Sequence, residues 1–107
     1  MATGRLYSPV QLGTGNTTIY NVPSGYYAVC NVSLTNTGTS AVTIQLAMSS
    51  GSTPGTAEWI EYGTTIVGKG VFERTGLVLQ PGYYLVALAS TGAVVNATVY
   101  GIETSTS

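Results

Sequence analysis

The sequence predicts an all-β protein, an antiparallel β-sandwich of about eight strands with a jelly-roll-like or immunoglobulin-like arrangement. Apolar and polar residues alternate along several segments, which is the period of a strand with one buried face. Clusters of turn-forming residues separate these segments about every 8–12 positions. No window has the period of an amphipathic helix. These patterns define the fold class and leave the strand order open.

The first part of the chain is an arm, residues 1–15, in which Gly and Pro interrupt any regular pattern. A strand is predicted at residues 17–22. The clearest alternation lies in residues 26–35, where every second residue from Tyr26 to Leu34 is apolar. We therefore expect the sandwich domain to cover residues 16–103.

A second alternating segment follows at residues 42–48, and the turn cluster "NTGTS" before it predicts a hairpin between the two strands. The sequence "GKG" at residues 68–70 predicts another hairpin turn. Later strands are predicted at residues 57–62, 64–67, 71–79, 83–89 and 94–102. Gly76 is a candidate bulge. The polar end "ETSTS" should fray, so residues 104–107 are expected to be a tail.

Two segments, "VPSGYY" and "LQPGYY", repeat one arrangement. Pro presets φ for a turn, and Gly supplies the positive φ that a type II turn needs. Tyr then starts a strand. Because neighbouring residues of a strand face opposite sides, one ring of each pair should enter the core. The other ring should lie at the rim or at an interface.

Charge is scarce: charged residues make up 7% of the chain, against a usual share of about a quarter. The net charge of −1 supplies no electrostatic footprint for nucleic acid. We expect no membrane partner, because no apolar run approaches about 18 residues and no basic cluster is present. Residues 1–10 also lack the apolar core of a signal peptide, so synthesis without export is expected.

Ser, Thr, Asn and Gly take the place of charge on the expected surface. Soluble monomers usually keep surface charge for colloidal stability. This composition favours a surface that packs against copies of the chain or against other proteins. The alternative is a neutral, hydroxyl-rich surface without such a role.

The residue inventory argues against catalysis, since the chain has no His and all four of its acidic residues are Glu. Ser-His-Asp and Cys-His systems and the usual zinc and calcium ligand sets are thereby removed. Cys30 lies on the apolar face of its strand and is expected to be a core residue. Glu58 and Glu61 are three positions apart, which on a strand places them on opposite faces. We expect no catalytic residue, no metal site and no cofactor.

Aromatic residues leave one ligand-binding alternative. Trp59 with Tyr62, or the Tyr pairs at residues 26–27 and 83–84, are candidates for a platform on which a sugar ring stacks. The alternative interpretation places one Tyr of each pair in the core and the other at a rim or interface.

Four segments together resemble small virion structural proteins of tailed bacteriophages, notably those that infect marine cyanobacteria: "MATGRLYSP", "TTIYNVPSGYYAVCNVSLTNTG", "AEWIEYGTTIVGKGVFERTGLVL" and "VNATVYGIE". The likeness covers residues 1–103. It implies a non-enzymatic particle component that is made in the host cytoplasm and repeated many times in the virion. Capsid decoration is the first expectation, and a neck, tail or fibre-base component is close behind. A carbohydrate-binding module for host adhesion is the further alternative.

Trp and Tyr are typical interface anchors, and most charges gather between residues 58 and 76. The arm is expected to lie across a neighbour with Arg5 as its ionic anchor, so that its removal weakens assembly and leaves the fold intact. Expected partners are further copies of the chain, with a trimer as the expected state, and the major capsid protein. The expected subunit contacts are Arg5, Tyr7, Tyr27, Glu58, Trp59, Glu61, Tyr62, Glu73, Arg74 and Tyr84.

Overall fold

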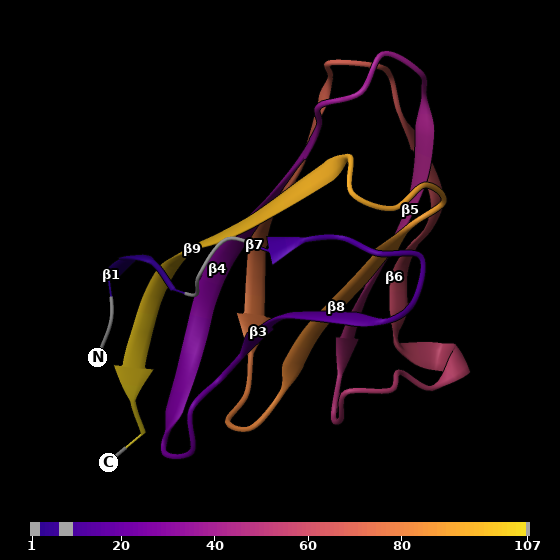
Figure 1. Ribbon diagram of the computed structural model, residues 1–107. Helices are drawn as coiled ribbons and strands as arrows, with labels where there is room; N and C mark the ends of the chain where they lie inside the picture. Colours follow the sequence, from indigo (N-terminus) through magenta and orange to yellow (C-terminus); the bar gives the residue numbers. More distant parts are fainter. Residues whose placement is uncertain (1–2, 7–9, 107) are drawn as a thin grey trace.

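The computed structural model describes residues 3–6 and 10–106, and it confirms an antiparallel β-sandwich (Figure 1). Sheet A contains β1 (Thr3–Arg5), β9 (Val95–Ser105), β4 (Tyr26–Asn36) and β7 (Val71–Leu79) in spatial order, with β2 (Val10–Gln11) also paired to β9. Sheet B contains β3 (Thr17–Asn21), β8 (Tyr84–Ala89), β5 (Val42–Ser49) and β6 (Trp59–Ile66). A short 3-10 turn, η1 (Thr56–Glu58), precedes β6. Among the described residues, no helix is long and apolar enough to cross a membrane.

The strand pairs are nested along the chain. The outermost pairs join β1 and β2 to β9, the next joins β3 to β8, the third joins β4 to β7, and β5 with β6 is the innermost. Between β2 and β9 every connection except the one from β5 to β6 therefore crosses from one sheet to the other. This nesting is the arrangement of a jelly roll, so the strand order decides between the two sandwich types that the sequence allowed.

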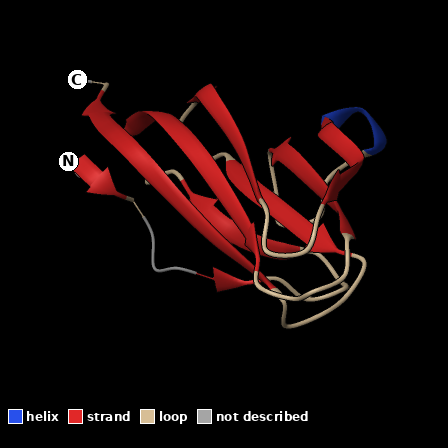
Figure 2. Cartoon of the chain, turned by 90° about the horizontal axis from the view of Figure 1, so that it is seen from above, coloured by secondary structure: helices blue, strands red, loops and turns tan. Residues whose placement is uncertain are grey.

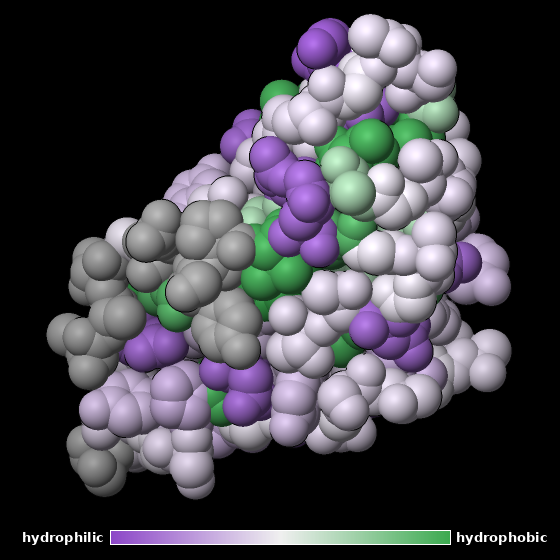
Figure 3. Space-filling view, in the orientation of Figure 1, coloured by the Kyte–Doolittle hydropathy of each residue, from purple (hydrophilic) through white to green (hydrophobic). Residues whose placement is uncertain are grey.

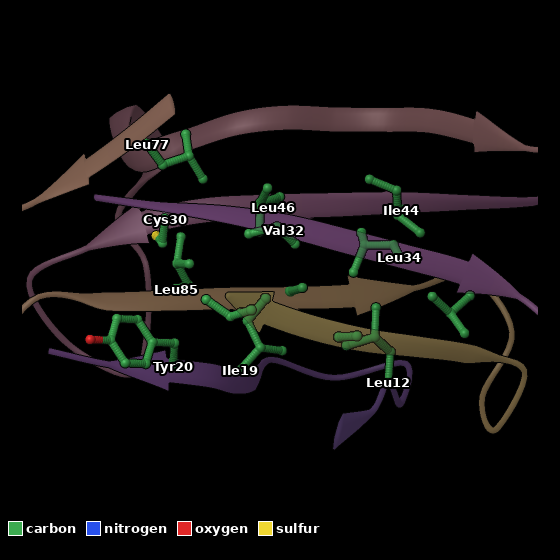
Figure 4. Packing of buried hydrophobic residues seen from close by; sticks show 14 of the residues in the cluster. Leu12, Ile19, Tyr20, Cys30, Val32, Leu34, Ile44, Leu46, Leu77 and Leu85 are labelled. Atoms are coloured by element: carbon green, nitrogen blue, oxygen red, sulfur yellow. The ribbon is translucent and has the colours of Figure 1, made fainter. Parts of the chain in front are cut away.

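The core lies between the sheets, where inward-facing side chains of both sheets meet (Figure 4). The alternation predicted for β4 is confirmed, since Cys30, Val32 and Leu34 are 0–1% exposed. Burial raises the pKa of the Cys30 thiol to about 12, so the thiolate does not form at neutral pH. The centre of β8 is also fully buried, at Leu85 and Val86.

One polar contact crosses this core. Tyr20 of β3 donates its hydroxyl hydrogen to Glu103 Oε2 of β9 over 2.5 Å, and both residues are buried. Burial, and next the hydrogen bond to Glu103, raises the pKa of Tyr20 well above its ordinary value of 10.0. The phenol therefore stays a donor at neutral pH. A buried carboxylate needs such a partner because an unpaired charge in a core is costly.

The two predicted hairpins are wrong, because both connections cross between the sheets. β4 pairs with β7 and β9, while β5 pairs with β6 and β8. Asn36 stabilises the connection from β4 to β5: its buried amide Nδ2 donates to the carbonyl oxygens of Ser40 (2.9 Å) and Ile66 (3.1 Å). Its Oδ1 accepts from the Gly38 N–H at 3.0 Å. These bonds satisfy the backbone of the corner in place of a hairpin ladder.

Two predicted strands, residues 57–62 and 64–67, are one strand in the structure. β6 runs from Trp59 to Ile66 and pairs with β5 through two register shifts, while Ala57 belongs to η1. The irregular register hides the continuity of β6 from a period-two search. The predicted bulge at Gly76 is confirmed by the register shift opposite residues 30–32.

The described residues near both ends of the chain are tied to the sandwich more firmly than predicted. β9 continues to Ser105 and pairs with β4 there, so the expected fraying is wrong for Thr104 and Ser105, and Ser107 lies outside the described residues. The described part of the arm pairs with β9 of the same chain, and Leu12 is fully buried in the core. Removal of the arm would open that core. From this packing we expect removal of the arm to destabilise the fold, in contrast to the expectation drawn from the sequence.

Both "PGYY"-type segments form the predicted type II turns. Gly25 (φ 84°) is the third residue of a turn closed by the Tyr26 N–H donating to the Pro23 carbonyl at 3.2 Å. Gly82 (φ 79°) has the same role in the second turn, where Pro81 is the second residue. Both turns lie at the same end of the sandwich (Figure 1).

We expect Tyr20→Phe to lower the free energy of unfolding by about 1–3 kcal/mol, because it removes a donor from a buried carboxylate and keeps the ring. Urea denaturation at pH 7, followed by circular dichroism, measures this change. Tyr62→Phe is the matched control on an exposed ring and should change the value by less than about 0.5 kcal/mol. Equal unfolding midpoints for Tyr20→Phe and the native chain would contradict the role of this contact.

Candidate functional site

Two surfaces on opposite faces of the sandwich stand out as candidate functional sites. Outward-facing side chains of sheet A form an apolar row, defined here as Tyr27, Val29, Val78 and Ile102. Outward-facing aromatic residues of sheet B border an aromatic groove, lined by Pro54, Thr56, Trp59 and Tyr62.

The apolar row crosses three neighbouring strands. Val29 of β4 is the register partner of Val78 on β7 and of Ile102 on β9, so the three side chains lie in one line. They are 44–61% exposed, and Tyr27 beside them is 39% exposed. Contiguous exposed apolar residues usually mark an interaction surface. Of these four residues, the sequence prediction selected Tyr27.

The residues that line the aromatic groove come from η1, the loop before it and the first part of β6. Figures 1 and 2 show η1 at the start of β6. Its volume is about 520 Å³. Trp59 and Tyr62 pair with Ala47 and Gln45 on the outward side of β5, so both rings face away from the core. The ring centroids are 5.9 Å apart with an interplanar angle of 71°, an edge-to-face contact. Tyr62 is 73% exposed, whereas Trp59 is partly buried.

Glu58 organises the loop that forms one side of this groove. Its Oε1 accepts from the Gly55 N–H at 2.8 Å and from the Ser49 hydroxyl at 2.9 Å, and its Oε2 accepts from the Ser50 N–H at 3.1 Å. The backbone donors of Gly55 and Ser50 hold the pKa of Glu58 below its ordinary value of 4.5. The carboxylate therefore joins the end of β5 to the turn that leads into Trp59.

Three further charged residues expected at subunit contacts, Glu61, Glu73 and Arg74, have partners within the chain. Arg74 of β7 and Glu61 of β6 form an ion pair between the two sheets, and the Thr64 hydroxyl donates to Glu61 at 2.6 Å. Glu73 accepts from the Tyr100 hydroxyl at 3.1 Å on the outer face of sheet A. These carboxylates thus stabilise the fold, and the Glu61–Arg74 pair closes the edge where β6 and β7 meet.

The Tyr pairs divide between faces as the alternation requires. Tyr26 and Tyr83 pack against the core, whereas Tyr27 belongs to the apolar row. Tyr84 is half-buried on the outward side of β8.

The remaining expected contacts belong to the arm. The backbone of Arg5 pairs with Tyr100 of β9, which places it at the edge of sheet A. The Arg5 side chain and the whole of Tyr7 lie outside the described residues.

The subunit contacts predicted from the sequence are all charged or aromatic residues, so Val29, Val78 and Ile102 are not among them. A usable signal was present: Val29 lies on the face of residues 26–35 opposite to the apolar one. An aliphatic residue at an outward position of an otherwise polar face indicates a contact surface. Its neighbours Val78 and Ile102 come from remote strands, so only the structure shows that the three form one row.

Each of the four Glu residues is hydrogen-bonded within the chain, to Tyr20, Thr64, Tyr100 and the loop before η1. Within residues 3–6 and 10–106, no cluster of three or more potential metal-ligating side chains is found. The site chemistry that these surfaces offer is therefore apolar contact and aromatic stacking.

Comparison with protein-family models, with curated proteins and with solved structures gives no match to this chain. The likeness to phage virion proteins therefore stays a prediction that rests on the sequence segments alone.

Acid should loosen the aromatic groove. Because the folded-state pKa of Glu58 is lowered, its stabilisation is complete above about pH 4.5 and is lost as the pH falls through that lowered pKa. We expect a change in the emission of Trp59, the single Trp of the chain, over that range. Glu58→Gln should abolish this transition, and Glu73→Gln should retain it. A transition of the same midpoint and size in Glu58→Gln would show that another group causes it.

Proposed function

We propose that this chain is a non-enzymatic structural protein of a tailed-bacteriophage virion that decorates the capsid and associates with further copies of itself. The observation that carries the proposal is the apolar row on the outer face of sheet A. A neck, tail or fibre-base position is the alternative location. The segments that resemble virion proteins support either location, and the apolar row supports the self-association.

The apolar row is small, and its size limits the affinity of a contact between two copies. Complete burial of a Val or Ile side chain contributes roughly 1.5–3 kcal/mol, and these residues are already about half covered. Association costs roughly 4–15 kcal/mol, so one such contact gives at most a weak pair. A lattice in which every copy has several neighbours gains strength by multivalency. The row is thus suited to a protein that is present in many copies on one particle.

The electrostatics of the surface also favour contact between copies. The chain has seven charged residues and a net charge of −1, so identical chains repel one another little. Figure 3 shows a face on which residues of intermediate hydropathy prevail and strongly hydrophilic ones are few. Such a surface loses little hydration energy when it is covered.

The jelly-roll arrangement is consistent with this proposal as a fold-level analogy. Jelly rolls occur in viral capsid proteins and also in lectin domains, and a fold by itself does not define a function. The case against catalysis rests on the site: the chain has no His or Asp, and the carboxylates are engaged in structural hydrogen bonds.

Self-association through the apolar row can be tested with two lysine variants of β7. Val78 belongs to the row, and Val71 is an equally exposed valine at the other end of the same strand. We expect Val78→Lys to weaken association about tenfold or more, and Val71→Lys to leave it unchanged. Light scattering over a concentration series measures both. A native chain that stays monomeric at millimolar concentration, or equal effects of the two variants, would contradict self-association through the row.

The particle role is tested on purified virions of a phage that encodes this chain. Mass spectrometry should find the chain at many copies per particle, and a cryo-EM map should place a jelly-roll density of this shape on the capsid surface. Density at the neck or tail would favour the alternative location. Absence of the chain from purified virions would refute the proposed function.

A further inference from the structure

We propose that the aromatic groove beside η1 binds a neutral saccharide. This inference goes beyond a structural role in a particle and concerns the face of the sandwich opposite to the apolar row. It rests on the shape of the groove, on its side chains and on the absence of a cation among the described residues that line it.

The two rings of the groove form a corner. Because Tyr62 meets Trp59 edge to face at 71°, the groove has two aromatic walls at a steep angle to one another. A pyranose ring has one face of C–H bonds, which packs on an aromatic ring, and a rim of hydroxyl groups, which needs hydrogen-bond partners. The corner supplies a wall for the C–H face, and Thr56, which also lines the groove, carries a hydroxyl group that can bond to the rim.

The dimensions suit a small ligand. The groove has a volume of about 520 Å³, within the range of roughly 300–1,000 Å³ that is usual for ligand sites. Its wall is already formed: Glu58 fastens the loop between β5 and η1 through three hydrogen bonds. A ligand therefore orders little of the chain when it binds, which lowers the free-energy cost of binding.

The charges around the groove select against acidic sugars. Glu58 places a carboxylate at the end of η1, two residues after Thr56. Its lowered pKa keeps this carboxylate ionised at neutral pH. Arg74, on the facing sheet, is paired with Glu61. A sulfated or uronic-acid polymer would meet a negative charge without a compensating cation, whereas a neutral pyranose meets no such penalty.

The position of the groove leaves it open in an assembled state. Its rings face outward from sheet B, and the apolar row faces outward from sheet A on the other side of the core. η1 also lies on the side of the molecule away from β1 and the end of β9 (Figure 2). A chain that docks through the apolar row would thus present the groove to solvent. Saccharide binding is nevertheless a property of the isolated chain and does not depend on docking.

Trp59 is the single Trp of the chain, so tryptophan emission reports directly on this groove. The full chain is titrated with maltohexaose, cellohexaose, mannohexaose and neutral galactan, and with polygalacturonate as the acidic arm. We expect a saturable change in emission with at least one neutral probe and none with polygalacturonate. Tyr62→Ala should weaken binding about tenfold or more, whereas Tyr62→Phe, which keeps the ring, should stay within about threefold of the native chain.

Tyr27→Ala is the matched control, since it removes an exposed Tyr from the opposite face and should bind as the native chain does. Circular dichroism confirms that each variant is folded. The proposal is overturned if no neutral probe at about 10 mM changes the emission. It is also overturned if polygalacturonate alone binds, or if Tyr62→Ala binds as tightly as the native chain. Light scattering on the same samples reports self-association separately, so failure of one proposal does not imply failure of the other.

Discussion

The long pairing of β4 with β9 is the interaction on which the rest of the structure depends. The ladder runs from the pair of Tyr26 with Ser105 to the pair of Asn36 with Val95. Its inward side carries much of the core, and its outward side carries the centre of the apolar row. Gly101 makes the ladder possible: a Cβ there would lie 2.2 Å from the Val29 carbonyl oxygen, and its φ of 152° is unfavourable for other residues.

The inner faces of the two sheets pack against each other, so only the outer faces are available for contacts with other molecules. The two outer faces differ in the side chains that they present. Hydrophobic packing and the hydrogen bond from Tyr20 to Glu103 join the sheets inside the sandwich, and the pair of Glu61 with Arg74 joins them at one edge. Because the surface has few charges, the exposed aliphatic and aromatic side chains are its most distinctive contact groups. Sheet A presents them as a row, whereas sheet B, together with η1, presents them as a groove.

Much of the fold could be predicted from local patterns, and the errors have a common cause. Alternation located β4 and β5, and the Pro-Gly turns placed the starts of β4 and β8. The hairpin predicted at residues 36–40 failed because the turn residues show that the chain changes direction but not which sheet it enters next. The split of β6 failed because its register with β5 shifts twice. For the site, aromatic character pointed to Trp59 and Tyr62. In the apolar row, Val29 had a local signal in its position on a mostly polar strand face, whereas Val78 and Ile102 join it only through the strand pairing.

The sequence by itself determined the fold class, the two type II turns and the separation of inward from outward positions along each strand. These features depend on neighbours within a few residues, where steric preference and period-two alternation act directly. The tertiary structure alone decided the nested jelly-roll order, the partner of Glu103 and the meeting of Val29 with Val78 and Ile102. Those contacts join residues far apart in the chain, and they form because two apolar faces must bury each other.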